Sequence, residues 1–244
     1  MLKGKTIFIT GSSRGIGAAT AKLAKEYGAK VIVHSEIDSP ELENLAVELQ
    51  AEKVICDVGD REAVMTEIKK LTQKGIHIDC LANVAGMRET KDFLETNDED
   101  WLASFRTNVL GVVHMCQAVI PQMQSRKYGR IVNVSSIRGY AQGTLATRLP
   151  YGVAKASVIN LTAALAKEYA KDGININSIS PGGVNTNMAK DWGEEVRKRN
   201  SDVLLGRIAE PKEIAEAICF FLSDKASYAT GQDFLFDGGY VIGK

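Results

Sequence analysis

The sequence predicts a doubly wound α/β domain in which seven parallel strands form one sheet with helices on both faces. Short β-branched runs alternate with longer amphipathic segments, which is the pattern of repeated strand–helix–strand units. The strand-like runs are apolar throughout rather than alternating, as expected for a parallel sheet buried on both faces. Because the 244 residues contain no low-complexity linker and no repeat of fixed period, we expect a single domain over residues 1–244.

The elements follow in a regular order along the chain. The expected strands are 6–10, 30–34, 53–56, 80–83, 130–135, 175–180 and 233–237. The helical patterns between them cover 16–27, 40–50, 61–73, 98–125, 150–171 and 211–223. Right-handed crossovers between these strands predict the spatial order 3-2-1-4-5-6-7. One segment, 182–205, departs from this rhythm, and we expect a substrate lid there with an apolar cover that includes Met188, Trp192, Val203, Leu204 and Leu205.

Composition excludes several classes of function. The 30 basic and 30 acidic residues balance, so nothing favours nucleic acid or an anionic membrane as a partner. The start, MLKGKTIFIT, is too short and polar for a signal peptide, and no apolar run approaches the roughly 20 residues of a spanning helix. The four cysteines are widely spaced, and the three histidines lie near neither a cysteine nor each other. We therefore expect no metal site, and we expect buried thiols in a reducing cytoplasm.

A glycine-rich turn joins the first strand to the first helix. Gly11 permits the tight turn, Gly15 lets the backbone approach a pyrophosphate, and Gly17 allows close packing of helix and strand. The N–H groups at the start of that helix would then face the phosphates, with the helix dipole in favour. The alternative is a glycine turn without a ligand. The preceding strand and following helix favour a dinucleotide.

Tyr151 and Lys155 lie four residues apart in YGVAKAS, so a helix places both on one face. A carbonyl that accepts hydride needs a proton, and free tyrosine, with a pKa near 10, is poorly matched to neutral pH. We expect the neighbouring cation, together with the positive ring of an oxidised nicotinamide cofactor, to favour the phenolate; lowering the pKa by about three units takes roughly 4 kcal/mol. The alternative is a surface pair worth a few tenths of a kcal/mol.

Together, Thr10-Gly11-x-x-x-Gly15-x-Gly17 and Tyr151-x-x-x-Lys155 resemble the classical short-chain dehydrogenase/reductase family, and the likeness covers nearly the whole chain. It implies a Rossmann-type fold and NAD(P)-dependent oxidoreductase activity. Residues 206–239 are similar to the closing segment of the 3-oxoacyl-(acyl-carrier-protein) reductase branch. The other matching positions are Asp57-Val58, Asn83-Val84-Ala85-Gly86, Asn108, Ser136, and Pro181-Gly182 with Thr186.

The resemblance implies a catalytic set of Ser136, Tyr151, Lys155 and Asn108. Ser136 holds the substrate oxygen, since Ser136 and Gly139 match the family's Ser-x-x-Gly, whereas Ser135 is read as a strand-end residue. Lys155 also bonds the nicotinamide ribose. Asn108 holds a water that relays protons to Lys155; the alternative is a buried amide satisfied locally. The Ser136–Tyr151 gap is two residues longer than the family's commonest spacing, which predicts an enlarged substrate loop.

The same likeness implies a set of cofactor-binding residues spread over the glycine turn and the ends of several strands. They are Gly11, Ser13, Arg14, Gly15, Ile16, Gly17, Ser35, Asp57, Val58, Asn83, Ala85, Gly86, Tyr151, Lys155, Pro181, Gly182, Val184 and Thr186. NADP is favoured over NAD, because Ser35 replaces the acidic residue that would bond a ribose 2′-hydroxyl and Arg14 supplies a phosphate-binding cation. Glu36 argues for NAD.

The expected substrate is a small carbonyl or secondary alcohol, with a 3-oxoacyl thioester on acyl carrier protein as one candidate. Lys127 lies near a position where that branch presents a cation to the carrier, whereas Asp172 departs from it. Arg138 and Arg148 could meet an acidic or phosphate-bearing substrate, but solvated loop charges are the simpler interpretation. The apolar faces of 98–125 and 150–171 exceed what one sheet face covers, so we expect a homotetramer or homodimer.

Other functions stay open with less support. A short-chain dehydrogenase for a small ketone, sugar or other alcohol would use the same residues. A non-catalytic NADP-binding regulator needs no proton relay. A serine hydrolase lacks its G-x-S-x-G elbow here, and no histidine is evidently placed as a base. Sugar-nucleotide epimerases and dehydratases share Tyr-x-x-x-Lys, but they carry a different glycine spacing and a larger C-terminal region.

Overall fold

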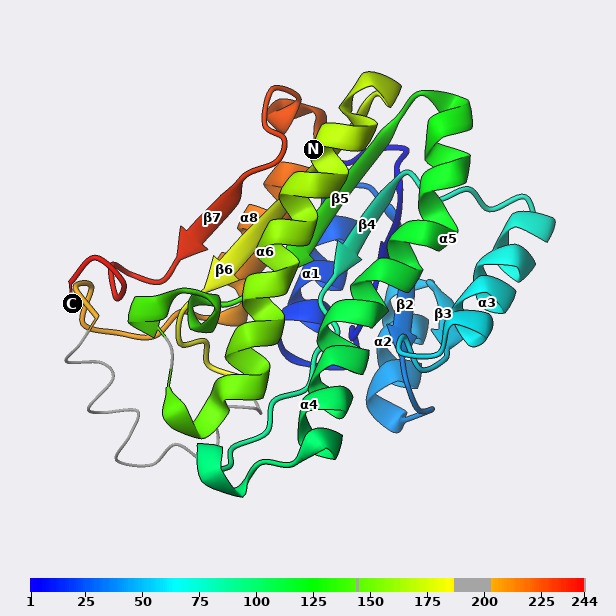
Figure 1. The fold of residues 1–244 in the computed structure, drawn as a ribbon. Helices are drawn as coiled ribbons and strands as arrows, with labels where there is room; N and C mark the ends of the chain where they lie inside the picture. Colours follow the sequence, from blue (N-terminus) through cyan, green and yellow to red (C-terminus); the bar gives the residue numbers. More distant parts are fainter. Residues whose placement is uncertain (144, 187–202, 244) are drawn as a thin grey trace.

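Seven strands form one sheet in a computed structural model that describes residues 1–143, 145–186 and 203–243. All neighbouring strands run parallel, in the order β3-β2-β1-β4-β5-β6-β7 (Figure 1). The predicted fold class and strand order are confirmed. The strands are β1 (Thr6–Ile9), β2 (Lys30–Ser35), β3 (Glu52–Ile55), β4 (Cys80–Asn83), β5 (Gly129–Val134), β6 (Ile174–Pro181) and β7 (Asp233–Phe236).

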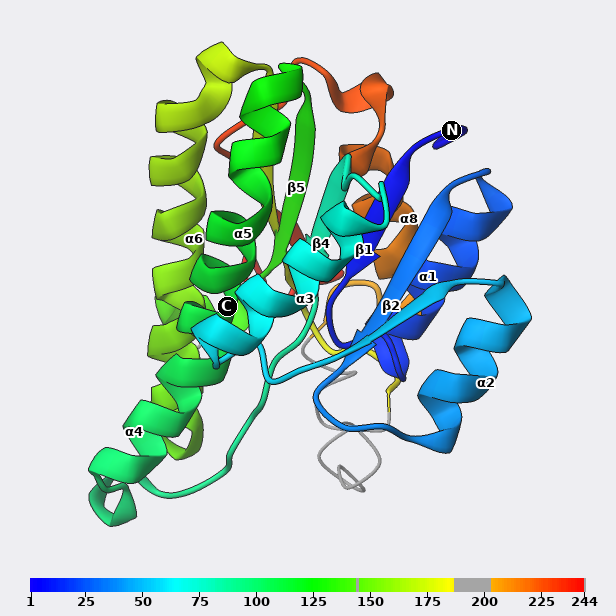
Figure 2. The same cartoon turned by 90° about the vertical axis from the view of Figure 1, so that its right-hand side faces the viewer.

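Helices cover both faces of the sheet (Figure 2). One face carries α1 (Gly15–Glu26), α2 (Pro40–Leu49) and α8 (Pro211–Leu222); the other carries α3 (Arg61–Gln73), α5 (Gly111–Arg126) and α6 (Leu149–Tyr169). Successive strand residues enter opposite cores: Ile7 and Ile9 pack with α1 and α8, and Phe8 packs with α3 and α5. This two-sided burial is the reason why the strands are apolar throughout.

The predicted helix over 98–125 is interrupted at one point. It consists of α4 (Asp98–Phe105), a π-helical turn at Arg106–Leu110 and α5. A capping box between Asn97 and Asp100 begins α4. The π-helical turn contains Asn108, one of the predicted catalytic residues. Such turns are frequent at functional sites, because the extra residue redirects a side chain within an otherwise regular helix.

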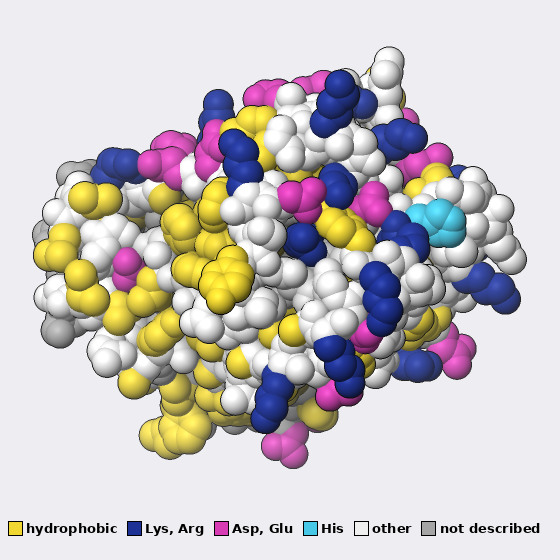
Figure 3. Space-filling model, turned by 90° about the horizontal axis from the view of Figure 1, so that it is seen from above, with side chains coloured by type: hydrophobic (Ala, Val, Ile, Leu, Met, Phe, Trp, Pro, Cys, Tyr) yellow, Lys and Arg dark blue, Asp and Glu magenta, His cyan; other side chains and the backbone are white. Residues whose placement is uncertain are grey.

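The surface at the amino ends of the strands carries mixed charge. Figure 3 views this side and shows basic and acidic side chains interspersed, with hydrophobic groups gathered toward the left. No single sign of charge dominates the face shown. Among the helices within the described residues, none combines the length and apolarity required to cross a bilayer.

The glycine turn after β1 is shaped by close backbone contacts. Gly11 and Gly15 adopt φ of +62° and +58°, the left-handed region that favours glycine. A Cβ on Gly11 would lie 2.7 Å from the Cα of Ala85, so any side chain there would force the turn away from the loop after β4. Gly17 packs against the carbonyl of Gly11, that is, against the turn itself rather than the strand.

The buried side chain of His34 holds this turn in place through hydrogen bonds. Its Nδ1 accepts from the N–H of Gly11 at 3.2 Å, and its Nε2 donates to the carbonyl of Cys56 at 2.9 Å. The backbone of Ser12 also bonds the carbonyl of His34. The imidazole therefore links the first turn to the ends of β2 and β3, and it must stay neutral to accept from Gly11. Burial lowers the pKa of His34 to about 4.

We expect this histidine to make the stability of the fold sensitive to acid. The unfolded chain binds the proton near pH 6.5, and the folded chain binds it only near pH 4, so acidification between these values favours unfolding. Neutral His34 contributes fully to the free energy of unfolding above pH 6.5, and about 3 kcal/mol of this contribution is lost as the pH falls to 4. His34→Gln can make both hydrogen bonds without titrating, so its free energy of unfolding should fall less steeply over this range.

Urea unfolding at a series of pH values measures this difference. His77→Gln, at an exposed histidine, is the matched control and should follow the native protein. Parallel pH curves for the native protein and His34→Gln would show that the buried imidazole has no such role.

Candidate active site

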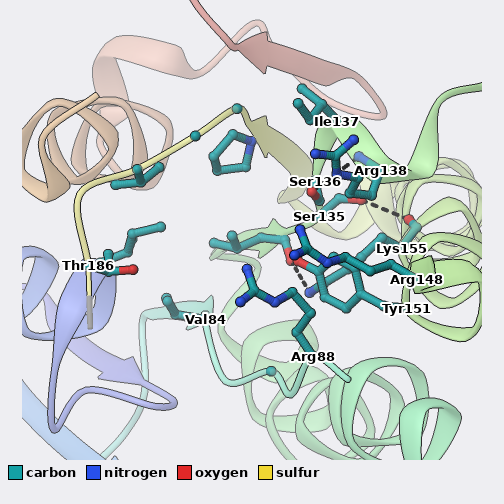
Figure 4. Close-up of a pocket in the computed structure, with 17 residues that line it drawn as sticks. Val84, Arg88, Ser135, Ser136, Ile137, Arg138, Arg148, Tyr151, Lys155 and Thr186 are labelled. Atoms are coloured by element: carbon teal, nitrogen blue, oxygen red, sulfur yellow. Dashed lines mark hydrogen bonds between the residues drawn. The ribbon is translucent and has the colours of Figure 1, made fainter. Parts of the chain in front are cut away.

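A cavity opens at the carboxyl ends of the central strands, where ligands bind in doubly wound sheets. It encloses about 810 Å³, part of which is open to solvent. Loops from both halves of the sheet line it, and Thr186 lies across it from Tyr151 and Lys155 (Figure 4). The lining residues are Ile16, Val84, Gly86, Arg88, Val134, Ser135, Ser136, Ile137, Arg138, Arg148, Tyr151, Lys155, Pro181, Gly182, Gly183, Val184 and Thr186.

Thr10 joins the glycine turn to the loop after β4. Its Oγ1 accepts from the N–H groups of Val84 at 2.9 Å and Ala85 at 3.0 Å. The hydroxyl is buried, so these bonds also satisfy backbone donors that a buried turn would otherwise leave without partners. The result is a fixed distance between the start of α1 and the loop after β4.

The start of α1 is suited to a pyrophosphate. Arg14 occupies the position before the helix, and its side chain makes no capping hydrogen bond to the first turn. The first backbone N–H groups of an α-helix lack partners within the helix, and they attract anions. Gly15 has no Cβ, and an added one would lie 3.3 Å from the side chain of Thr186, which lines the cavity opposite Tyr151. The residues present therefore fit a dinucleotide whose phosphates lie between α1 and the segment after β6.

The predicted Tyr–Lys pair lies in the first two turns of α6. Lys155 is 4 % exposed, and its Nζ donates to the carbonyl of Val134 at 2.7 Å. The same Nζ lies 5.7 Å from the centre of the Tyr151 ring, so the ammonium and the phenol face one cavity. Ser135 donates its hydroxyl to the backbone carbonyl of Lys155 at 2.7 Å and so anchors α6 to the end of β5.

Ser136 stands beside the phenol. Its hydroxyl is hydrogen-bonded to Tyr151 and accepts from the N–H of Arg138 at 3.2 Å. The strand β5 ends at Val134, and the extended backbone at Ser136 turns this side chain toward the cavity. A substrate oxygen that bonds the serine would therefore also reach the phenol. The two neighbouring serines differ in their contacts: Ser135 holds the backbone of α6, whereas Ser136 faces Tyr151.

Burial dominates the electrostatics of the pair in the protein without its cofactor. Burial raises the pKa of Tyr151, although the hydrogen bond from Ser136 and the charges of Arg88, Arg138 and Arg148 oppose that rise. Burial lowers the pKa of Lys155 to about 8. In the protein without its cofactor, desolvation therefore outweighs the effect of the lysine on the phenol, and the expected lowering of its pKa, which includes the positive ring of an oxidised nicotinamide, stays a prediction.

Asn108 lies near Lys155, and Gly86 borders the space beside both side chains. Its Nδ2 donates to the carbonyls of Met87 and Ser104, each at 3.0 Å. Within the described residues, its buried Oδ1 has no hydrogen-bond partner. A Cβ on Gly86 would lie 2.9 Å from this oxygen and 3.5 Å from the Nζ of Lys155, so both atoms border the space beside Gly86. An unsatisfied acceptor and a donor that share one space suit a bridging water.

The predicted cofactor residues divide into three groups. Eight of them line the cavity, namely Ile16, Gly86, Tyr151, Lys155, Pro181, Gly182, Val184 and Thr186. Eight others do not line the cavity and lie on the glycine turn, at the end of β2 and after β3, namely Gly11, Ser13, Arg14, Gly15, Gly17, Ser35, Asp57 and Val58. Asn83 and Ala85 have structural contacts, since Ala85 backs the glycine turn.

Asn83 bonds within the core instead of facing the cavity. Its Nδ2 donates to Asn133 at 2.8 Å, and Asn133 donates to Thr162 at 2.9 Å. This buried chain connects β4, β5 and α6. Asp57 is also engaged: its carboxylate accepts from the N–H of Gly59 at 2.7 Å and from Arg106 at 2.9 Å. A carboxylate has further lone pairs, so an adenine amino group can still reach it.

Sequence reasoning underestimated a group of arginines. Arg138 and Arg148 are each 6 % exposed and line the cavity, so their interpretation as solvated loop charges was wrong. Arg88, which the sequence analysis did not select, lines it too. The signal was present, because all three arginines lie in loops that leave the carboxyl ends of β4 and β5 or precede Tyr151.

Other expectations concern residues elsewhere. Lys127 forms an ion pair with Asp172 at 2.5 Å on the side of the molecule away from the cavity. Of the expected lid, Val203 is buried with Ile137 and Tyr240, and Leu204 and Leu205 are exposed. Met188 and Trp192 lie outside the described residues. Over those residues, the structure contains no group of three His, Cys, Asp or Glu side chains that could hold a metal ion.

Comparisons with known proteins agree with this geometry. Residues 11–241 match a family model described as enoyl-(acyl carrier protein) reductase. The chain is 37 % identical to a 3-oxoacyl-[acyl-carrier-protein] reductase of Thermotoga maritima over 247 residues, which cover 99 % of each protein. It is also 37 % identical to the oxidoreductase UcpA of Escherichia coli over 256 residues, covering 99 % of this chain and 96 % of UcpA.

A solved structure shows the same fold. A gluconate 5-dehydrogenase from Burkholderia cenocepacia, in complex with NADP and tartrate, has a TM-score of 0.93 at 28 % identity, covering 99 % of this chain and 96 % of that one. The glycine turn, the Tyr151–Lys155 pair and these likenesses over nearly the full length lead to one conclusion: the chain belongs to the short-chain dehydrogenase/reductase family of NAD(P)-dependent oxidoreductases.

Proposed function

We propose that this oxidoreductase reduces a carbonyl, or oxidises the corresponding secondary alcohol, with Tyr151 exchanging the proton with the substrate oxygen. The observation that carries the proposal is the cluster in one cavity of a phenol bonded to Ser136 and the buried ammonium of Lys155. The nicotinamide, when bound, supplies or accepts the hydride.

Ser136 and Tyr151 together orient the substrate oxygen. In reduction, both hydroxyls donate to the carbonyl oxygen, and the phenol gives up its proton as the oxygen becomes an alkoxide. In oxidation, the phenolate takes that proton back. Because burial raises the pKa of Tyr151, the free site favours the neutral phenol, which is the form that reduction needs.

Lys155 and Asn108 return the proton. With a pKa of about 8, Lys155 is mostly charged at pH 7, and its ammonium stabilises the phenolate that reduction leaves. The space between its Nζ and the Oδ1 of Asn108 suits a water, which would pass a proton from solvent toward the lysine. We propose that the π-helical turn at Arg106–Leu110 exists to hold Asn108 at this position.

We propose NADP(H) as the cofactor, in the cavity between α1 and the segment after β6. Ser35 ends β2, so no carboxylate stands there to repel a 2′-phosphate. Arg14 lies near Glu41 at the start of α2. Hydrogen bonds from the backbone and from Ser39 lower the pKa of Glu41 most, and the charge of Arg14 lowers it further. A guanidinium between α1 and α2 can bind a 2′-phosphate. The complex of the Burkholderia relative with NADP supports this choice.

Two substrate classes have support. The Thermotoga relative favours a 3-oxoacyl thioester carried on acyl carrier protein. The Burkholderia relative, a gluconate 5-dehydrogenase whose structure contains tartrate, favours a small hydroxy or oxo acid. Lys127, which the carrier hypothesis would use, already pairs with Asp172. The arginines that line the cavity favour the second class.

We also propose that the chain acts as a homodimer or homotetramer. Leu102 on α4, Leu110 in the π-helical turn and Val153 on α6 are exposed at 68 %, 45 % and 42 %. An oligomer would bury them, and each lies on an element that carries or adjoins a catalytic residue.

Tyr151→Phe tests the proton transfer. It removes only the hydroxyl, so kcat for carbonyl reduction should fall by about 100- to 10,000-fold, while the Kd for NADPH changes little. Lys155→Met should impair both quantities, because the lysine serves the phenol and the ribose. Stopped-flow kinetics and fluorescence titration with NADPH measure the two effects.

Tyr169→Phe is the matched control, since Tyr169 lies on the same helix about 27 Å further along the axis. It should retain native rates. Full turnover by Tyr151→Phe would exclude the proposed role, and NADPH binding without turnover of any carbonyl would favour the regulator.

Ser35→Asp and Arg14→Gln test the cofactor. A carboxylate at the end of β2 repels the 2′-phosphate, and loss of the guanidinium removes a charge-assisted hydrogen bond. Each change should therefore lower the ratio of kcat/KM for NADPH to that for NADH by about 10-fold or more. Lys22→Gln, on the exposed side of α1, should leave the ratio unchanged. A native ratio below one would show that NADH is the cofactor.

A further inference from the structure

We propose that the substrate carries an oxyanion, either a carboxylate or a phosphate ester, which Arg88 and Arg148 bind beside the reacting carbon with Arg138 behind them. The inference rests on the proposed hydride transfer at Tyr151 and names the class of substrate for that site. It depends on where the three guanidinium groups lie, how they are held, and which part of the ligand they can reach.

Three separate segments bring these arginines together. Arg88 belongs to the loop after β4, Arg138 follows β5, and Arg148 immediately precedes α6. All three line the cavity on the side of Tyr151, and Figure 4 shows the guanidinium ends of Arg88 and Arg148 directed into it.

The charge and the shape of these side chains suit an anion. Arg138 and Arg148 are each 6 % exposed, and a guanidinium stays charged at any pH that a folded protein meets. Like charges that share one poorly hydrated cavity repel each other, and the repulsion falls when an anion enters between them. Carboxylates and phosphates match the planar fork of arginine, which can bond them in pairs.

The cluster is held in place by the enlarged loop before Tyr151. Arg148 donates from Nε to the hydroxyl of Thr90 at 3.1 Å, and the N–H of Lys91 donates to the carbonyl of Thr147 at 2.9 Å. The loops that carry Arg88 and Arg148 are thus bonded to each other. These bonds hold Arg148 and join its loop to the loop of Arg88 before a ligand arrives, which reduces the entropy lost on binding.

Arg138 is held from the other side. It donates to the carbonyl of Gly143 and lies 6.0 Å from the ring centre of Tyr240. Tyr140 anchors the same loop to β7 through Asp233, at 2.5 Å. The loop that is two residues longer than the family's commonest spacing therefore supplies a backbone partner for Arg138.

The position of the cluster assigns the anion to the substrate. Any 2′-phosphate of the cofactor belongs near Arg14 and Ser35, at the ends of β1 and β2, and the pyrophosphate belongs at the start of α1. Arg88, Arg138 and Arg148 lie instead around Tyr151, and their charges act on its phenol. A second explanation is that they serve only to make Tyr151 more acidic. Pairs of substrates that differ only in charge distinguish these two explanations.

The test compares kcat/KM for two pairs: acetoacetate with methyl acetoacetate, and dihydroxyacetone phosphate with dihydroxyacetone. The native holoenzyme should prefer the anionic member of at least one pair by about 10- to 100-fold, and the preferred pair identifies carboxylate or phosphate. Arg88→Gln and Arg148→Gln should each reduce that preference about 10-fold. An effect through Tyr151 alone acts equally on both members and cancels in the ratio.

Lys69→Gln, which removes a positive charge from the exposed side of α3, is the control and should keep the preference. A preference for the neutral member of both pairs, or one that Arg88→Gln and Arg148→Gln leave intact, would overturn the inference and spare the proposed function.

Thermal shift of the NADPH complex with malonate and with malonamide, a neutral analogue, covers the case in which no carbonyl is reduced. Stabilisation by malonate alone, lost in Arg148→Gln, would support the anion site although the proposed function had failed. Equal responses to the two compounds would overturn the anion site as well.

Discussion

The buried ammonium of Lys155 is the constraint on which the rest of the site depends. It lies 4 % exposed at the end of β5, with one hydrogen bond to Val134, and burial lowers its pKa to about 8. A charge in that position needs partners around it. The phenol of Tyr151, the space beside Asn108 and the ribose of a bound dinucleotide are the groups that can serve it. Together they form the proposed path for the proton.

A framework of buried polar groups keeps these partners in register. Thr10 ties the glycine turn to the loop after β4, and His34 ties it to the ends of β2 and β3. Asn83 and Asn133 connect β4 and β5 to Thr162 on α6, the helix that carries Tyr151 and Lys155. Each of these side chains makes hydrogen bonds within the protein. The framework therefore stabilises the geometry of the site without leaving these polar atoms unpaired in the core.

The fold could be predicted from the sequence because each level of the pattern agrees with the next. Apolar strands, amphipathic helices and a glycine turn after the first strand specify the parallel sheet and its switch point, and no observed strand end differs from the expected one by more than one residue. The π-helical turn at Asn108 could not be predicted in this way, because 98–125 reads as one continuous helix. It depends on how that helix packs over α6 and the loop after β4.

For the candidate site, the motifs located Ser136, Tyr151 and Lys155, which the structure brings into one cavity. They could not give the electrostatics. Whether Arg138 and Arg148 are solvated depends on the path of the loop between Ser136 and Tyr151, and the direction of the Tyr151 pKa depends on burial set by distant elements. A short spacing in the chain shows which groups meet, but desolvation, which decides their pKa values, is a property of the assembled cavity.

The most direct measurement of the account is a titration of Tyr151 by NMR, with ¹³C at the ζ carbon of tyrosine, in the protein alone and in complex with NADP⁺. We expect a pKa above the ordinary value of about 10 in the free protein, because burial dominates, and a markedly lower one in the complex, because the oxidised nicotinamide adds a positive charge beside Lys155 and the three arginines. A pKa that stays high when NADP⁺ binds would contradict the proposed role of the phenol.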